Sequence, residues 1–226
     1  MQIFIDSANL EEIEKWLRYG IADGVTTNPS IMLRDGMHDF EAGAKQISRL
    51  IGDRPMSVEV TTNDPEEMLD QARTFAGWSP NINVKIPVID SSGRPMLDVI
   101  QTLEKEGIRV NTTVIMSFGQ TILATKAGAT YVSIFAGRVA DEGGDPFRLI
   151  QDARTWLDLW GYTAKIIVGS VRQAMDIQKC AVAGAHILTV PPSLLDTIAD
   201  HNFSRETVRR FLEDAQKTEQ IARAKG

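Results

Sequence analysis

The chain contains a single cysteine, Cys180, among its 226 residues. One cysteine excludes an intrachain disulfide, and nothing else in the sequence indicates an oxidising compartment. No apolar stretch approaches the roughly 20 residues that span a bilayer. The N-terminus also lacks the basic start and long apolar run of a signal peptide. These absences predict a cytoplasmic protein that does not enter a membrane.

Basic residues are in the minority, with 24 Lys and Arg against 30 Asp and Glu and a net charge of −6. Such a balance argues against nucleic acid or an anionic membrane as the main partner. The three histidines are scattered without metal-ligand spacing, and no Gly-rich nucleotide loop is present. We therefore expect neither a metal nor a cofactor.

Short β-rich runs alternate with amphipathic helical stretches along almost the whole chain. The predicted strands are 3–6, 24–28, 57–60, 83–87, 109–114, 131–135, 165–169 and 186–190. Eight β/α units without a linker predict an α/β protein, a single (β/α)₈ TIM barrel over residues 1–200, with a doubly wound sheet as the alternative. One helix, with Asp145 as its N-cap and Pro146 at its first position, has a clear start signal.

Residues 201–226 lie beyond the eighth unit and read as an extra C-terminal helix. Ser204 is its predicted N-cap, and Val208, Phe211 and Leu212 fall on one face together with Ala215. An apolar face needs a surface to cover it. We expect this extension to pack on its own barrel or on a neighbouring subunit.

The alternation of residues within the strands predicts where a functional site lies. In a closed barrel one side of each strand packs on the outer helices and the other points into the barrel. If the apolar positions point outward, the polar ones point inward, toward the carboxyl ends where such barrels place their sites. The inward polar set comprises Asp6, Thr26, Asn28, Glu59, Asn83, Lys85, Asn111, Thr113 and Ser133. A structural ion pair would explain one buried lysine, but not polar residues from six strands.

Lysine chemistry suggests a role for this cluster. Burial favours the neutral amine of a lysine such as Lys85, and a neutral amine can form a Schiff base with a carbonyl substrate. The resulting iminium withdraws electrons, so that a neighbouring carbon–carbon bond can break. Asp6 and Glu59 supply two carboxylates for proton transfer, and Thr113 is placed to help hold a water molecule.

Two arginines follow the late strands, where barrels of this type often bind phosphate. Arg138 follows residues 131–135, and Ser170 and Arg172 follow residues 165–169. A lone arginine in such a loop is usually a solvated charge. Two guanidinium groups and a hydroxyl near the lysine instead predict a phosphate clamp.

The residues around this cluster resemble the transaldolase family of class I aldolases, in particular its small subfamily that includes fructose 6-phosphate aldolases. The resembling segments are FIDSANLEEI, DGVTTNPSI, SVEV, NVKIP, GIRVNTTVIMSFGQ, AGATYVSIFAGR and GSVRQ. They run in the order of the family to about residue 195. The resemblance implies a (β/α)₈ barrel without a cofactor that acts on sugar phosphates in the pentose phosphate pathway.

The resemblance also assigns roles to individual residues. Lys85 matches the Schiff-base lysine, Asp6 the acid/base for carbon–carbon cleavage, and Glu59 with Thr113 the pair that holds the catalytic water. The residues that match the binding of the dihydroxyacetone part are Asn28, Asn111 and Ser133; Thr26 and Phe135 also belong to the predicted substrate pocket. Arg138, Ser170 and Arg172 match the phosphate ligands. Small members of the family assemble into pentamers and decamers through C-terminal helices, so the resemblance implies a homo-oligomer.

Several activities remain open at this stage. Glu59 with Phe135 is the transaldolase combination, since fructose 6-phosphate aldolases tend to have glutamine and tyrosine there. This predicts transfer of a dihydroxyacetone unit from a ketose phosphate, such as fructose 6-phosphate or sedoheptulose 7-phosphate, to an aldose phosphate. The alternatives are release of free dihydroxyacetone, a specialised transaldolase for an unusual sugar phosphate, and a barrel that binds sugar phosphates without catalysis. The long loop over residues 89–96, with Asp90 and Arg94, departs from the family pattern and bears on the acceptor.

Overall fold

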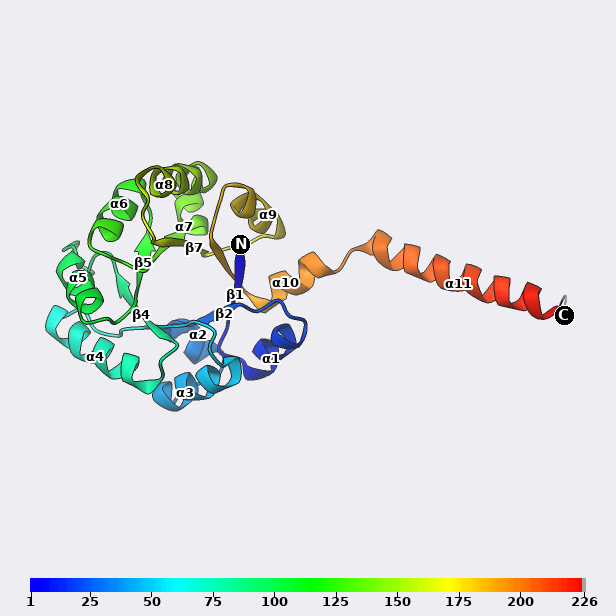
Figure 1. Ribbon diagram of the computed structural model, residues 1–226, viewed down its shortest axis with the longest axis horizontal. Coiled ribbons are helices and arrows are strands. Elements are labelled where there is room, and N and C mark those ends of the chain that lie inside the picture. The colour runs from blue at the N-terminus through cyan, green and yellow to red at the C-terminus, as the bar shows by residue number, and fades with distance from the viewer. Residues whose placement is uncertain (225–226) are drawn as a thin grey trace.

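Eight parallel strands close into a barrel in the computed structural model, which describes residues 1–224 (Figure 1). The strands are β1 (Gln2–Asp6), β2 (Gly24–Thr26), β3 (Met56–Glu59), β4 (Ile82–Pro87), β5 (Val110–Ile115), β6 (Tyr131–Phe135), β7 (Lys165–Gly169) and β8 (Ile187–Val190). Each strand pairs with the next in the chain, and β8 pairs with β1. The closed order confirms the predicted (β/α)₈ barrel and rules out the doubly wound sheet, which is open.

Within residues 1–224, nine helices lie between successive strands around the barrel, and two more follow the last strand. They are α1 (Leu10–Arg18), α2 (Pro29–Arg34), α3 (Phe40–Ile51), α4 (Pro65–Trp78), α5 (Leu97–Lys105), α6 (Phe118–Lys126), α7 (Ala136–Asp141), α8 (Pro146–Trp160), α9 (Ala174–Val182), α10 (Pro192–Ala199) and α11 (Asn202–Ala224). The predicted start of α8 is confirmed, because the Asp145 carboxylate accepts hydrogen bonds from the N–H groups of Phe147 and Arg148, both at 3.0 Å. Among residues 1–224 there is no helix with the length and apolar character to cross a membrane.

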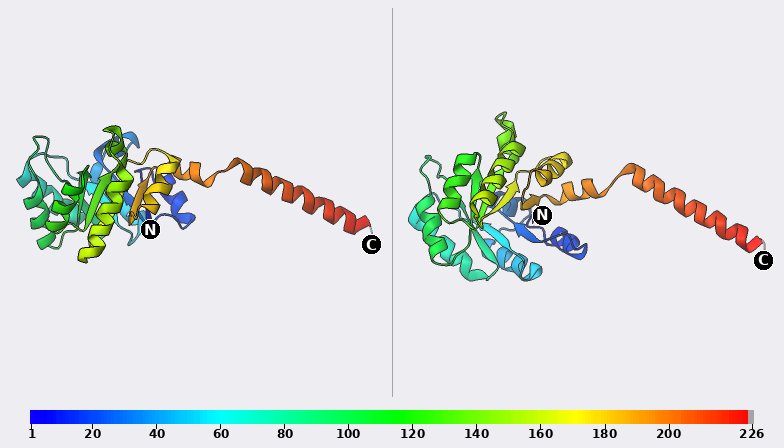
Figure 2. Two further views of the ribbon diagram at one scale, coloured as in Figure 1. Left: turned by 90° about the horizontal axis from the view of Figure 1, so that it is seen from above. Right: turned by 45° about the horizontal axis from the view of Figure 1, so that its top comes forward.

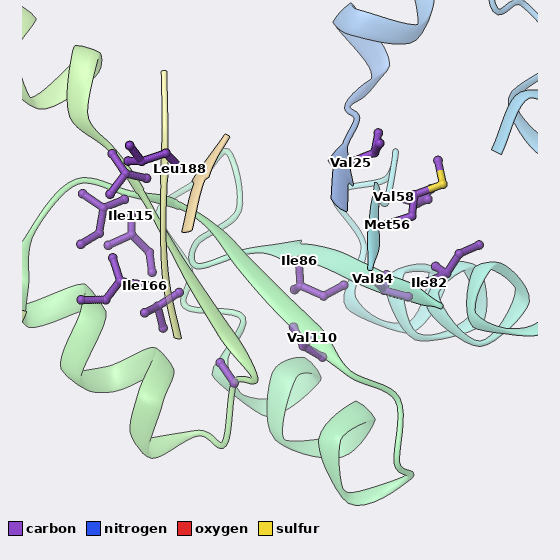
Figure 3. Packing of buried hydrophobic residues seen from close by; sticks show 14 of the residues in the cluster. Val25, Met56, Val58, Ile82, Val84, Ile86, Val110, Ile115, Ile166 and Leu188 are labelled. Atoms are coloured by element: carbon purple, nitrogen blue, oxygen red, sulfur yellow. The ribbon is translucent and has the colours of Figure 1, made fainter. Parts of the chain in front are cut away.

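The strands divide their side chains between two apolar clusters, as the alternation predicts. The larger cluster lies between strands and helices and includes Val84, Ile86 and Ile166 (Figure 3). The smaller one fills the amino-terminal half of the barrel interior and consists of Phe4, Tyr131, Ile167 and Ile187. Phe4 fits there because its neighbour is Gly24: a Cβ on Gly24 would lie 2.7 Å from the Phe4 ring. The carboxyl-terminal half of the interior is left to polar side chains.

The C-terminal helix α11 projects away from the barrel (Figures 1 and 2). It begins at Asn202, so the prediction that Ser204 caps it is wrong. The chain is already helical there, since the Arg205 N–H donates to the His201 carbonyl at 3.1 Å. None of the described residues of α11 is buried, and Phe211 is 67% exposed. The helix therefore does not cover its own barrel, and its docking on a neighbouring subunit stays a prediction.

Candidate active site

A cavity of about 210 Å³ opens at the carboxyl ends of the strands. It is lined by Asp6, Thr26, Asn28, Lys85, Asn111, Thr113, Ser133, Phe135, Arg138, Gly169, Ser170 and Thr189. The structure thus brings together every predicted site residue except Glu59 and Arg172. Glu59 lies directly behind Lys85, and Arg172 lies at the rim.

Lys85 is buried, with 5% of its surface exposed, because β4 is flanked on both sides and its inward face points into the barrel. Its ammonium group donates to the Glu59 carboxylate at 2.8 Å and to the Thr27 carbonyl at 3.1 Å. The pairing of β3 with β4 places Glu59 opposite Lys85. A buried ammonium is costly without partners, and these two acceptors compensate for its lost hydration. One of the two, the Thr27 carbonyl, was not predicted from the sequence.

Asp6 is partly buried at the end of β1 and receives a hydrogen bond of 2.7 Å from the Thr26 hydroxyl. Thr26 also makes a short hydrogen bond with Thr189 on β8. Burial raises the pKa of Asp6, although the Thr26 hydrogen bond and the charges of Lys85 and Arg34 oppose that rise. A carboxyl group with a raised pKa is suited to holding and releasing a proton during a reaction.

An amide and two hydroxyls form a buried hydrogen-bonded row across β3, β5 and β6. The Ser133 hydroxyl donates to Asn111 Oδ1 at 2.7 Å, and Asn111 Nδ2 donates to the Ser57 hydroxyl at 3.0 Å. The row fixes which end of the Asn111 amide faces Ser133. Thr113 lies nearby, and its buried hydroxyl has no hydrogen-bond partner among residues 1–224. A buried hydroxyl without a protein partner is suited to binding substrate or water.

The predicted anion-binding residues occupy the opposite rim. Arg138 on α7 and Ser170 after β7 line the cavity. Ser170 has φ of 57°, a left-handed conformation that residues other than glycine rarely adopt and that is often found at functional sites. Arg172 does not line the cavity, because its guanidinium donates to both carboxylate oxygens of Asp141 at 2.6 and 2.7 Å. This ion pair was not predicted from the sequence.

Two cavity residues, Gly169 and Thr189, were missed in the sequence. Alternation would have found Thr189, because it lies between the outward-facing Leu188 and Val190. Gly169 could not be predicted, because its place in the cavity wall depends on residues of other strands. A Cβ there would lie 3.5 Å from Thr189 and 3.8 Å from the Phe135 ring. Asn28 carries a structural role as well, since its side chain accepts the Ile31 N–H at 2.8 Å and caps α2.

The site joins a buried amine, two carboxylates and several hydroxyls, with a guanidinium at the rim. Across residues 1–224 no cluster of three or more His, Cys, Asp or Glu side chains is positioned to hold a metal ion. The chemistry that this set supports is addition of an amine to a carbonyl, with carboxylates moving protons.

Comparisons with known proteins agree with this arrangement. The family model described as transaldolase/fructose-6-phosphate aldolase matches residues 3–225. A probable transaldolase of Streptococcus equi subsp. zooepidemicus is 42% identical over 214 residues, which cover 95% of this chain and 97% of the relative. Probable transaldolases of Lactiplantibacillus plantarum and Dehalococcoides mccartyi are 40% and 39% identical and cover 95% of this chain, with 96% and 97% of their own lengths matched.

Solved structures share the architecture at low sequence identity. Thiamine phosphate pyrophosphorylase from Pyrococcus furiosus superposes with a TM-score of 0.58 at 11% identity, over 84% of this chain and 85% of that one. A lactate oxidase of Pediococcus acidilactici gives 0.56 at 16% identity, over 85% of this chain and 63% of that one. These two likenesses concern the fold alone. The family model and the relatives place the sequence: the chain is an enzyme of the transaldolase/fructose-6-phosphate aldolase family.

Proposed function

We propose that this enzyme is a transaldolase that transfers a dihydroxyacetone unit from a ketose phosphate to an aldose phosphate through a Schiff base on Lys85. One observation carries the proposal. The Lys85 amine is buried at the end of the barrel, 2.8 Å from the Glu59 carboxylate, and faces a cavity that Asp6 also lines. The names of the relatives, probable transaldolases, support it.

The reaction begins at Lys85. Glu59 takes a proton from the ammonium across their hydrogen bond, and the free amine adds to the ketone carbon of the donor. The carbinolamine that results loses water to become an iminium. Glu59 and the Thr113 hydroxyl hold the water that carries protons in this step, which gives the otherwise unpartnered Thr113 a role.

Asp6 acts in the cleavage of the carbon–carbon bond. It accepts the proton of the hydroxyl on the fourth carbon, the bond between the third and fourth carbons breaks, and the electron pair moves into the iminium to give an enamine. The aldose phosphate leaves. Asp6 keeps the proton because burial raises its pKa, and it returns that proton to the aldehyde oxygen of the acceptor when the enamine attacks.

The remaining side chains bind the substrate. Asn111 and Ser133, held in one row with Ser57, hydrogen-bond the hydroxyls of the dihydroxyacetone part, and Thr26 and Asn28 complete this wall. Arg138, Ser170 and Arg172 bind the phosphate. The cavity volume of about 210 Å³ suits one small sugar chain.

The presence of both Glu59 and Phe135 favours transfer over simple aldol cleavage, because this combination resembles that of transaldolases. The competing activity is release of free dihydroxyacetone without an acceptor. A third possibility is binding of sugar phosphates without chemistry. Binding alone does not explain why the Lys85 amine lies together with two carboxylates and a buried hydroxyl, whereas release of free dihydroxyacetone would use the same groups as transfer.

The loop after β4 is the feature on which acceptor choice depends in this proposal. Its Asp90 carboxylate accepts the N–H groups of Ser92 and Arg94, at 2.8 and 2.9 Å, so the loop has a defined shape. Arg94 pairs with Asp98 at 3.4 Å and is about half exposed. A cation held near the barrel mouth suits an acceptor with a second anionic group, which is the specialised-transaldolase variant of the proposal.

Two measurements test the function. Borohydride reduction in the presence of dihydroxyacetone or fructose 6-phosphate is expected to leave a covalent adduct on Lys85, found by peptide mass mapping, and Lys85→Ala is expected to leave none. Lys45→Ala, which removes an exposed lysine, is the matched control. Absence of the adduct in the unaltered protein would refute Schiff-base chemistry and favour the binding barrel.

Product analysis separates transfer from cleavage. The enzyme is incubated with fructose 6-phosphate and a panel of aldose phosphates, and products are identified by mass. New ketose phosphates that appear only with an acceptor are expected. Free dihydroxyacetone formed without any acceptor would show that the enzyme is an aldolase.

Assembly and location are also part of the proposal. The unburied apolar face of α11 supports a homo-oligomer, and the resemblance to small members of the family favours a pentamer or decamer; the proposed location is the cytoplasm. Light scattering that gives the mass of a monomer, 25.0 kDa, would refute the oligomer.

A further inference from the structure

The ion pair between Arg172 and Asp141 uses only one edge of the guanidinium. Nη1 and Nη2 donate to the two carboxylate oxygens at 2.6 and 2.7 Å. A bidentate fork of this kind fixes the plane of the guanidinium as well as its position. The Nε–H edge takes no part in it.

The free edge lies beside Ser170. Arg172 Nε and Ser170 Oγ lie 2.9 and 2.8 Å from one point, which is the position that a Cβ on Gly137 would occupy. Ser170 lines the cavity, and Arg138, the residue after Gly137, does so too. Arg172 is thus at the rim, with Nε next to a hydroxyl that faces the cavity.

The backbone around this point is held together from both sides. The Gly137 N–H donates to the Ser170 carbonyl at 3.1 Å, and Ser170 itself adopts a left-handed conformation. Because Gly137 has no side chain, the start of α7 can approach the loop after β7 this closely. Asp141 lies at the other end of α7, and its carboxylate accepts hydrogen bonds from the Arg172 guanidinium. Both ends of the short helix therefore contact that loop.

We infer that Asp141 is a positioning residue, which holds the Arg172 guanidinium so that its Nε edge faces a phosphate bound by Ser170 and Arg138. The inference rests on the proposed function, because it needs a phosphorylated substrate. An arginine that is ordered before binding loses less conformational freedom when the phosphate arrives, and so binds it more tightly. Repulsion between Asp141 and the phosphate is small, since Arg172 neutralises the carboxylate and the pair is about half exposed to screening solvent.

The full-length Asp141→Asn variant tests this. We expect its KM for fructose 6-phosphate to rise about three- to tenfold with little change in kcat, the range set by losing one preordered side chain. The dissociation constant of inorganic phosphate, measured by calorimetry, is expected to rise by a similar factor. Asp141→Glu keeps the carboxylate and is expected to remain closer to the unaltered protein.

Controls separate positioning from general damage. Asp158→Asn removes an exposed carboxylate that binds Arg154 at 2.7 Å, and we expect it to leave both constants unchanged. Adduct formation with dihydroxyacetone, which has no phosphate, is expected to be equal in Asp141→Asn and the unaltered protein. In an Arg172→Ala background, Asp141→Asn is expected to have no further effect.

Two results would overturn the inference. An unchanged KM would show that Arg172 needs no partner to bind phosphate, and a lower KM would show that Asp141 competes with phosphate for Arg172. Failure of the proposed function looks different. It would appear as a missing dihydroxyacetone adduct in the unaltered protein, while phosphate calorimetry still reports on Asp141.

Discussion

Replacing Glu59 with Gln would leave the buried Lys85 beside a neutral partner. In the structure the Lys85 ammonium has two acceptors, Glu59 at 2.8 Å and the Thr27 carbonyl at 3.1 Å. Only the first carries a negative charge. We expect Glu59→Gln both to destabilise the fold and to slow adduct formation at Lys85, because the proton acceptor next to the amine is lost.

The size of the destabilisation follows from the burial of the pair. Removing one partner of a buried ion pair costs roughly 3–5 kcal/mol. The cost is lower here, because glutamine keeps an oxygen that accepts a hydrogen bond and the Glu59 side chain is 19% exposed to water. A neutral hydrogen bond contributes about 1 kcal/mol, so the free energy of unfolding is expected to fall by about 1–3 kcal/mol. For a chain of this length that corresponds to a Tm lower by roughly 2–12 °C.

Urea unfolding followed by circular dichroism measures this change. Asp158→Asn, in an exposed ion pair, is the matched control and is expected to cost less than about 1 kcal/mol. The double variant Lys85→Met, Glu59→Gln removes both charges and is expected to be more stable than Glu59→Gln alone. If Glu59→Gln were as stable as the unaltered protein, water or another group would satisfy Lys85 as well as the carboxylate does, and the reasoning would be wrong.

Three further predictions concern other parts of the site and the core. Asp6→Asn is expected to abolish cleavage while the Lys85 adduct still forms, and to raise stability. The sign follows from the raised pKa of Asp6. As pH increases above the usual value of 3.8, Asp6 ionises in the unfolded chain before it does so in the folded protein, which lowers the free energy of unfolding. The stability gained with Asn is therefore absent at lower pH, grows until the raised pKa is passed and is then constant. Thermal unfolding between about pH 3 and about pH 8, which lie on either side of the usual carboxyl pKa, checks it, and an equal gain at both ends would contradict it. Gly137→Ala is expected to weaken binding of inorganic phosphate, measured by calorimetry, since its Cβ would clash with the Ser170 carbonyl oxygen; unchanged affinity would show that the loop can move. Cys180 is buried, which raises the pKa of its thiol to about 12, so a thiol reagent at neutral pH is expected to label it only after denaturation, and rapid labelling of the folded protein would exclude this burial.

Much of the barrel could be predicted because its strands alternate so regularly. Apolar residues outward and polar residues inward on β4 placed Lys85 inside, and the same pattern on β1 and β3 placed Asp6 and Glu59 beside it. The structure confirms these positions. Strand ends were harder. The second strand was predicted to reach Asn28 but ends at Thr26, because the Asn28 side chain caps the next helix.

Features that depend on distant parts of the chain could not be predicted. The Arg172–Asp141 pair joins α7 to the loop after β7, and a sequence pattern does not show whether a guanidinium binds a carboxylate or a ligand. The pairing of β5 with β6 shifts between Thr112 and Ile115, and Val114 has φ of 55°. The residue types on β5 do not indicate this shift in register. Local sequence patterns determine which face of a strand a side chain lies on. Its hydrogen-bond and ion-pair partners on other strands depend on how the barrel closes.

The contact between Thr26 and Thr189 links formation of the site to the order in which the barrel folds. It joins the first and last strands of the barrel, and through Thr26 it reaches Asp6. The lysine and its carboxylate partner are in the first half of the chain, yet the environment of Asp6 is complete only when β8 has docked against β1. A nascent or truncated chain that stops before β8 would carry most of the reactive groups on an open, wet sheet, where Asp6 would be hydrated. The catalytic environment of Asp6 therefore forms only when the last strand closes the barrel.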